Sequence, residues 1–314
     1  MAHAHHHDHD HDHGGHGHHH AHAPADFGAA FAIGTTINFG FVLVELAYGL
    51  LSHSMALVAD AGHNFGDVLG LLAAWGAASL ARRAPTARFT YGLRRGTILA
   101  ALVNAALLLV AVGAIAAEAA NRLIAPEKVA NGTVMIVAAI GIVVNGATAL
   151  LFARGRADDI NIRGAFLHMA YDAAISAGVV VAAAIAAAAG WLRLDPLVSL
   201  AIAGVILAGT WSLLRDSVGL ALDVVPPGVD AAAVRTFLES QPGVARLHDL
   251  HIWPMSTTET ALTVHLVVPG AHPGDAFLAK MAEALRHRFR IGHATVQIEQ
   301  GEGAVCVLEA DEVV

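Results

Sequence analysis

The chain has 314 residues, of which 56% are hydrophobic and only 14% are charged. A typical soluble domain has about 25% charged residues, so the composition excludes an ordinary soluble protein and indicates a membrane protein. The formal net charge is -8, and lysine and arginine form no long block, so nothing indicates nucleic-acid binding. The single cysteine, Cys306, excludes an intramolecular disulfide and a paired Cys-x-x-Cys metal cluster. Metal ligands, if there are any, are therefore expected to be nitrogen and oxygen.

The first 24 residues contain 12 of the 21 histidines and three aspartates, with no lysine or arginine. Such a segment cannot form a packed core, so we expect residues 1–26 to be a disordered tail. It also lacks the charged start and apolar run of a secretory signal. It is either a purification tag or a segment that binds divalent ions weakly. The interleaved aspartates favour weak metal binding.

Six apolar stretches are long enough to cross a bilayer, which requires about 20 residues. An even number of spans places both ends of residues 27–216 on one side of the membrane. Arginines fill the second and fourth links, whereas the first, third and fifth links contain few basic residues. Because basic links stay inside, both termini are expected to be cytoplasmic. The expected spans are 29–51, 57–80, 97–120, 131–153, 164–190 and 195–214.

After Pro226 and Pro227 the chain becomes less apolar and charged residues return, which indicates a soluble domain over residues 217–300. The order helix, strand, strand, helix, strand predicts a small ferredoxin-like α+β domain. Residues 301–314 are expected to form an acidic tail. The expected elements are a helix at 229–240, strands at 244–253 and 259–268, a helix at 272–289 and a strand at 293–300.

Two spans carry the same pair of polar residues at the same spacing. His63 and Asp67 lie four residues apart in the second span, and His168 and Asp172 repeat the pattern in the fifth. Residues four apart share one face of a helix. Two imidazoles and two carboxylates from facing helices can form a tetrahedral shell, and two carboxylates neutralise a divalent cation. The repeated pair therefore predicts an intramembrane metal site.

A structural role is the alternative, because one buried histidine or aspartate often makes a hydrogen bond between helices. The repeat on separate spans favours metal binding. Asp60 lies three residues before His63 and is equally consistent with a supporting or capping role.

These motifs resemble those of the cation diffusion facilitator family, and in particular its bacterial zinc exporters. The resemblance covers nearly the whole chain, through ALVADAGHNFGD, NIRGAFLHMAYDAAISAG, DPLVS, LLRDSV, HDLHIW and HATVQIE. It implies a homodimer that exchanges a cytoplasmic metal ion for protons by alternating access, with His63, Asp67, His168 and Asp172 as the transport site. It also favours His248 and His265 as a cytoplasmic metal-binding pair. Ordinary surface histidines are the alternative there, and a regular strand would point His248 and His251 to opposite faces.

The resulting prediction is efflux of a divalent cation across the bacterial cytoplasmic membrane by Zn²⁺/H⁺ antiport. Imidazole binds metal only when neutral, so protons and metal compete for the site. Nitrogen-containing ligands favour Zn²⁺, with Cd²⁺, Co²⁺ and Ni²⁺ also plausible, as substrate and not as a cofactor. The alternatives are an intramembrane metal-dependent hydrolase and a metal sensor or store that does not transport. The HExxH motif of many metal hydrolases is absent, so no enzyme is predicted.

Overall fold

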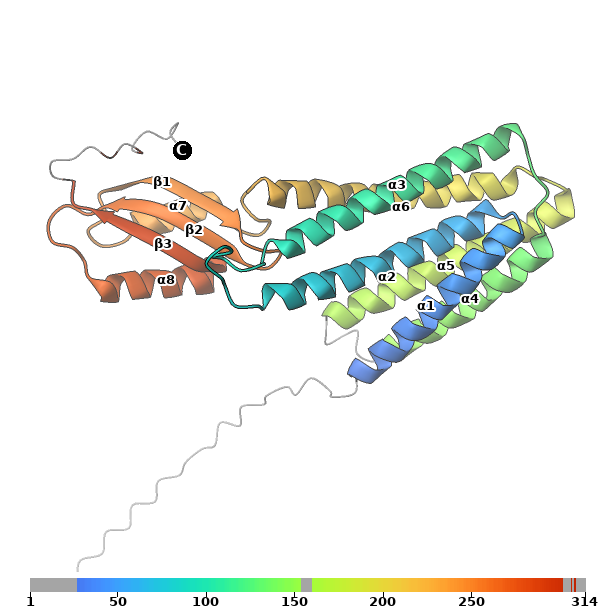
Figure 1. Ribbon diagram of the computed structural model, residues 1–314, viewed down its shortest axis with the longest axis horizontal. Helices are drawn as coiled ribbons and strands as arrows, with labels where there is room; N and C mark the ends of the chain where they lie inside the picture. Colours follow the sequence, from blue (N-terminus) through green and yellow to red (C-terminus); the bar gives the residue numbers. More distant parts are fainter. Residues whose placement is uncertain (1–26, 154–159, 302–305, 307, 309–314) are drawn as a thin grey trace, which may run out of the picture.

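The computed structural model describes residues 27–153, 160–301, 306 and 308, and shows a bundle of long helices joined to a small α/β domain (Figure 1). The expected tails at 1–26 and, for the most part, 301–314 lie outside the described residues. The bundle consists of α1 (Phe27–Leu51), α2 (Met55–Ala81), α3 (Gly96–Ile124), α4 (Asn131–Phe152), α5 (Ile160–Ala189) and α6 (Leu194–Ala221).

Four of these helices, α3 to α6, are long and apolar enough to cross a membrane by length and composition. The described part of α1 adds a shorter apolar stretch, Thr36–Leu51. Many large apolar side chains on the outside of the bundle are exposed, among them Val110, Val143 and Trp211. Such a surface is stable only in contact with lipid or another apolar surface, as expected for a membrane domain.

Helix α2 packs against α1, α3, α5 and α6, while α3 pairs with α6 and α4 pairs with α5. Figure 1 shows α3 and α6 side by side along one edge of the bundle. Small side chains let the helices approach closely, and Ala56, Ala59, Ala138 and Ala203 belong to the buried core. Helix α2 is therefore placed where its polar residues can meet those of α5.

The described parts of α1 and α2, which correspond to the expected spans 29–51 and 57–80, are not among the helices long and apolar enough to cross a membrane. The other differences from the expected spans lie at helix ends. Helix α6 continues to Ala221, beyond the expected end at residue 214, so the expected domain boundary at 216/217 falls inside it. Hydropathy falls at Arg215 and Asp216, but charged residues do not break backbone hydrogen bonds, and the helix extends past its apolar part.

The α/β domain follows the expected order: α7 (Ala231–Glu239), β1 (Arg246–Pro254), β2 (Thr260–Val267), α8 (Asp275–Phe289) and β3 (Ile291–Glu299). Strand β2 is central, antiparallel to β1 and parallel to β3. Buried residues of both helices and all three strands form one core, including Leu238, Leu262 and Leu285. Helix α8 begins three residues later than expected, because Pro273 and Gly274 precede it and Gly274 has a φ of 82°.

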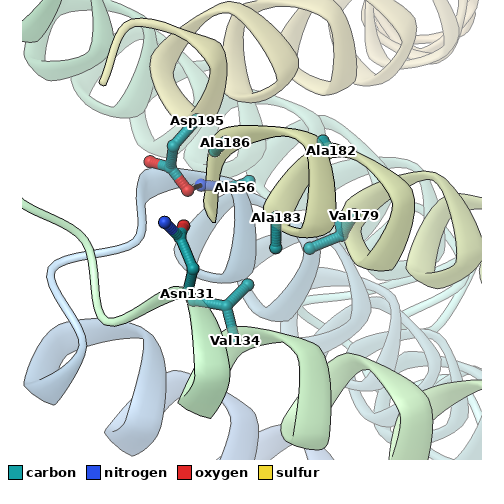
Figure 2. A pocket seen from close by; sticks show the side chains of 8 residues that line it. All are labelled: Ala56, Asn131, Val134, Val179, Ala182, Ala183, Ala186 and Asp195. Carbon is teal, nitrogen blue, oxygen red and sulfur yellow. Dashed lines mark hydrogen bonds between the residues drawn. The ribbon is translucent and has the colours of Figure 1, made fainter. Parts of the chain in front are cut away.

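At the end of the bundle away from the α/β domain, α6 holds the start of α2. The Asp195 carboxylate accepts hydrogen bonds from the backbone N–H of Met55, at 2.7 Å, and of Ala56, at 3.4 Å, and from the Ser54 hydroxyl. Figure 2 shows Asp195 and Asn131 on facing walls of a small pocket here, lined further in by alanine and valine side chains.

Candidate metal sites

The first cluster lies between α2 and α5 inside the bundle. The His168 Nε2 atom lies 3.4 Å from Asp67 Oδ2 and 3.6 Å from Asp172 Oδ2, and His63 Nε2 lies 3.6 Å from the same Asp67 oxygen. The two imidazole rings have centroids 6.1 Å apart and are nearly perpendicular. The structure thus brings together all four residues of the repeated pair.

Several atoms of this cluster that could bind a metal ion have no hydrogen-bond partner among the described residues. They are His63 Nδ1, Asp67 Oδ2 and both carboxylate oxygens of Asp172. The Asp172 side chain is only 1% exposed, whereas His168 is 41% exposed, so the cluster extends from the protein interior to an accessible edge. Buried polar atoms are normally paired, because an unpaired one loses its solvation without compensation. Two carboxylates and two imidazoles with free lone pairs match what a divalent cation requires.

Asp60 lies beside this cluster but makes its own contacts. Its Oδ2 atom accepts a hydrogen bond from the Ser176 hydroxyl at 3.1 Å, and its Oδ1 atom accepts one from the Asn64 amide at 3.5 Å. Glu45 of α1 is, like Asp60, fully buried. The sequence pattern indicated Asp60 but not Glu45, Asn64 or Ser176. An isolated glutamate inside the apolar run of α1 was the available signal.

The second cluster lies on the sheet of the α/β domain. His248 and His265 are paired neighbours on β1 and β2, with ring centroids 5.1 Å apart. Glu299, at the end of β3, has its Oε1 atom 3.0 Å from His265 Nδ1 and its Oε2 atom 3.4 Å from His248 Nε2. The Cys306 sulfur lies 3.6 Å from His265 Nδ1. Donor atoms of these four residues all lie within 4.8 Å of one another, a spacing that could hold a metal ion.

Two sequence-based expectations change at this cluster. Cys306 adds a sulfur atom to the candidate donors of this cluster, beside the nitrogen and oxygen donors that the sequence led us to expect. Strand β1 is also not regular, because its register shifts between His248 and His251 and Asp249 has a φ of 50°. This bulge does not bring His251 into the cluster. His251 Nε2 instead lies 2.9 Å from Asp249 Oδ1.

The environment of Glu299 favours its ionised form. Burial raises the pKa of this carboxyl, but hydrogen bonds from Cys306 and Gln297 and the charges of His248 and His265 outweigh burial, so its pKa is lowered. An ionised carboxylate between two imidazoles suits metal binding. Glu299 and Cys306 were missed in the sequence because only the parallel pairing of β2 with β3 brings them near His265.

The structure is a bundle of apolar helices joined to a small α/β domain, and histidines and aspartates converge inside the bundle. These features identify the class of protein as a membrane carrier of metal cations. The family profile described as the cation efflux transmembrane domain matches residues 31–220, and the one described as the cation efflux protein cytoplasmic domain matches residues 226–301. The chain belongs to the cation efflux family, the cation diffusion facilitators that its motifs resemble.

Curated relatives match over most of the chain. The zinc transporter ZitB of Escherichia coli is 38% identical and covers 86% of each chain. The metal cation efflux system protein CzcD of Cupriavidus metallidurans is 34% identical and covers 82% of each chain. A cadmium, cobalt and zinc/H⁺-K⁺ antiporter of Bacillus subtilis is 33% identical, over 83% of this chain and 85% of the relative.

Among solved structures, the metal-bound C-terminal domain of the CzcD transporter is 38% identical, with a TM-score of 0.22. It covers 23% of this chain and 99% of that structure. The family and the named relatives support efflux of divalent metal cations over the hydrolase and the non-transporting store.

Proposed function

We propose that the protein exports Zn²⁺ from the cytoplasm in exchange for protons, with His63, Asp67, His168 and Asp172 as the transported ion's ligands. The convergence of these four residues from α2 and α5, with unpaired donor atoms in the protein interior, is the observation that carries the proposal. The nitrogen-containing shell suits Zn²⁺, and Cd²⁺, Co²⁺ and Ni²⁺ are alternative substrates. The names of the relatives, which include zinc transporters and a proton-coupled antiporter, support zinc and protons as the exchanged ions.

The orientation and assembly belong to the same proposal. The arginine-rich link between α2 and α3 lies at the end of the bundle that faces the α/β domain, which supports our assignment of this end and of both termini to the cytoplasm of a bacterium. The name of the matched cytoplasmic-domain family model refers to a dimer, which supports a homodimer. Helix α6 carries the chain from the membrane domain, expected at 27–216, to the cytoplasmic domain, expected at 217–300, and ends beyond that expected boundary, at Ala221.

Metal and proton compete at His63 and His168, because an imidazole nitrogen that binds metal cannot hold a proton. When the site opens to a proton-rich outside, protonation of these histidines favours release of the ion. The protonated and empty carrier then returns to the cytoplasmic side. A single site that opens alternately to the two sides of the membrane is therefore sufficient to exchange the metal ion for protons.

A second, non-transported metal ion is proposed for the cytoplasmic domain, bound by His248 and His265 with Glu299 and Cys306. The observation that favours it is the 4.8 Å clustering of four donor atoms outside the bundle. Such an ion would link β1, β2 and β3 to Cys306, which follows β3, and so stabilise the domain.

The test of transport uses the full-length protein in liposomes with Zn²⁺ flux measured with and without a pH gradient. We expect flux that a proton gradient accelerates, and an Asp172→Ala variant that loses metal affinity by orders of magnitude. The apo variant should remain folded, since an acid within a span costs roughly 2.5–3.5 kcal/mol, which the substitution removes. A folded Asp172→Ala variant with wild-type flux would refute the transport site. Zn²⁺ binding without flux in the wild type would favour a sensor or store.

A further inference from the structure

The link between α2 and α3 is positively charged and has no acidic residue of its own. Residues 68–117, which include the end of α2, the link and most of α3, contain five arginines and no aspartate or glutamate. Residues from elsewhere neutralise two of these arginines, because Glu259 pairs with Arg94 and Asp223 pairs with Arg95. Three arginines remain without an acidic partner among the described residues: Arg82, Arg83 and Arg88.

These three arginines lie where the helices leave the membrane. Helix α3, which is long and apolar enough to cross it, begins at Gly96, and α2, which packs beside α3, ends at Ala81 (Figure 1). Trp75 of α2 is 70% exposed and lies about 10 Å before Arg82 along the helix. Exposed tryptophans are enriched at the boundary between hydrocarbon and headgroups, and each headgroup region is roughly 5–8 Å thick. The three arginines are therefore expected at the depth of the lipid phosphates.

The part of the link that contains Arg88 is a compact, exposed turn. The Thr86 N–H donates to the Phe89 carbonyl at 3.0 Å, the Phe89 N–H donates to the Thr86 hydroxyl at 3.1 Å, and the Gly92 N–H donates to the same Phe89 carbonyl at 2.9 Å. The Arg88 guanidinium lies 5.8 Å from the centroid of the Phe89 ring. Phe89 and Tyr91 are each 49% exposed. Exposed aromatic rings beside arginine are typical of a surface at the edge of a membrane.

The chemistry of the guanidinium group favours phosphate as the partner. Arginine remains charged at every physiological pH, and its planar group donates two parallel hydrogen bonds to a phosphate. Hydration alone is the alternative for an exposed arginine. At this depth, however, the neighbouring anions are lipid phosphates, and anionic lipids attract basic residues close to the membrane surface. A zwitterionic lipid attracts them less, because its own positive group balances its phosphate.

We propose that Arg82, Arg83 and Arg88 bind the phosphates of anionic phospholipids in the leaflet next to the α/β domain. The inference goes beyond the proposed exchange and does not depend on which ion is transported. Arg94 and Arg95 bond the same link to Glu259 and Asp223. A lipid bound to the link therefore also ties the α/β domain to the membrane surface.

The test is native mass spectrometry of the full-length protein in a neutral detergent, titrated with phosphatidylglycerol or with phosphatidylcholine. We expect the wild type to bind phosphatidylglycerol more tightly, and added salt to weaken this binding. Arg83→Gln combined with Arg88→Gln should lower the affinity for phosphatidylglycerol roughly 25-fold, from about fivefold for each arginine, and leave phosphatidylcholine binding unchanged. Arg83→Lys combined with Arg88→Lys keeps the charge and should retain most of the binding, which separates loss of charge from a change in fold.

Arg235→Gln combined with Lys280→Gln is the matched control, because it removes the same charge from α7 and α8 of the α/β domain. It should bind phosphatidylglycerol as the wild type does. Equal affinity of the wild type for the two lipids, or wild-type affinity in the Arg83→Gln and Arg88→Gln variant, overturns the proposal. Displacement of phosphatidylglycerol by inorganic phosphate or by polyglutamate at equal charge concentration also overturns it, in favour of a soluble anion or an acidic polypeptide.

Discussion

At the scale of single residues, the proposed transport site assigns different roles to its two aspartates and its two histidines. In this proposal Asp67 and Asp172 supply the charge that a divalent ion needs in a medium with few other charges. His63 and His168 supply nitrogen, which distinguishes borderline-soft ions such as Zn²⁺ from hard ions that prefer oxygen. Selectivity should therefore depend on the histidines.

We predict that His63→Asp relaxes selectivity toward Mn²⁺. The substitution replaces nitrogen by oxygen and adds negative charge, which suits a harder ion with more oxygen ligands. Competition assays in liposomes, with Zn²⁺ flux measured against rising Mn²⁺, give the change directly. His53→Asp is the control, because His53 lies in the link between α1 and α2, near Glu127 and outside the site. Identical selectivity in the His63→Asp variant and the wild type would mean that His63 is not a ligand.

Glu299 gives a prediction about pH in the cytoplasmic domain without metal. Its pKa in the folded protein lies below the ordinary value of 4.5, so its ionised form stabilises the fold at neutral pH, and this contribution is lost as pH falls through the lowered pKa. In Glu299→Gln we expect a lower unfolding temperature at pH 7 and a smaller further decrease in acid. Thermal unfolding of the full-length protein in detergent with a chelator, from about pH 7 to about pH 3, measures both, because this contribution is lost only below the ordinary pKa.

The control for this experiment is Glu283→Gln, because Glu283 is exposed on α8. It should follow the wild-type curve. An acid-side slope in Glu299→Gln equal to that of the wild type would contradict the role assigned to the Glu299 carboxylate.

At the scale of the elements, the start of α2 depends on a residue from α6. The Asp195 carboxylate accepts two backbone N–H groups of the first turn of α2 and the Ser54 hydroxyl, although 140 residues separate Asp195 from Met55. These N–H groups have no partner within the helix. These bonds tie the start of α2 to α6 and so help to set the position along the bundle of the proposed metal ligands His63 and Asp67.

Asp195→Ala should lower the stability of the protein by roughly 1–3 kcal/mol, because it leaves buried donors unpaired. Asp195→Asn keeps an acceptor oxygen and should recover part of the loss. Denaturation in detergent of both variants and of the wild type, each without metal, provides the comparison. Equal stability of Asp195→Ala and the wild type would show that water satisfies these donors.

Local patterns predicted the elements better than the contacts between them. The apolar runs and the His-x-x-x-Asp repeat identified the helices and the four clustered side chains, because helical spacing alone puts His63 and Asp67 on one face. The bulge at Asp249 and the approach of Cys306 to His265 depend on pairing of distant segments, which no local spacing encodes. The hydrogen bond from Ser176 to Asp60 likewise depends on how α5 packs on α2.

At the scale of the whole molecule, the cytoplasmic domain contacts the link between α2 and α3. Arg94 pairs with Glu259 in the turn between β1 and β2, and the Thr257 N–H donates to the Thr97 hydroxyl at 3.1 Å. The Tyr91 ring lies edge-on to His293 of β3, with centroids 5.6 Å apart. These contacts join the α/β domain to the start of α3, at the end of the bundle where α2 ends.

The salt bridges at this junction are partly exposed, so they should contribute little to global stability. Arg95 also pairs with Asp223, just after α6, at 2.5 Å, and the four charged side chains at the junction are 37–55% exposed. Exposed ion pairs typically contribute about 0–1 kcal/mol. Their effect should be local and should weaken as salt screens the charges.

We therefore predict that Arg94→Ala changes the unfolding temperature little but loosens the turn between β1 and β2. Glu259 loses its ion pair with the link, and the turn keeps the Thr97 contact and its own hydrogen bonds, among them those to the Ser256 hydroxyl and from the Met255 N–H to the Glu259 carbonyl. Hydrogen exchange of the full-length protein in detergent should rise in residues 255–260 and stay unchanged in the buried strand β2 from Leu262 onward. Adding salt to the wild type should reproduce part of the increase. Arg82→Ala, in the same link but bonded to Ser79, should leave the turn unchanged. Exchange in the turn that does not respond to Arg94→Ala would show that the ion pair does not hold the two domains together.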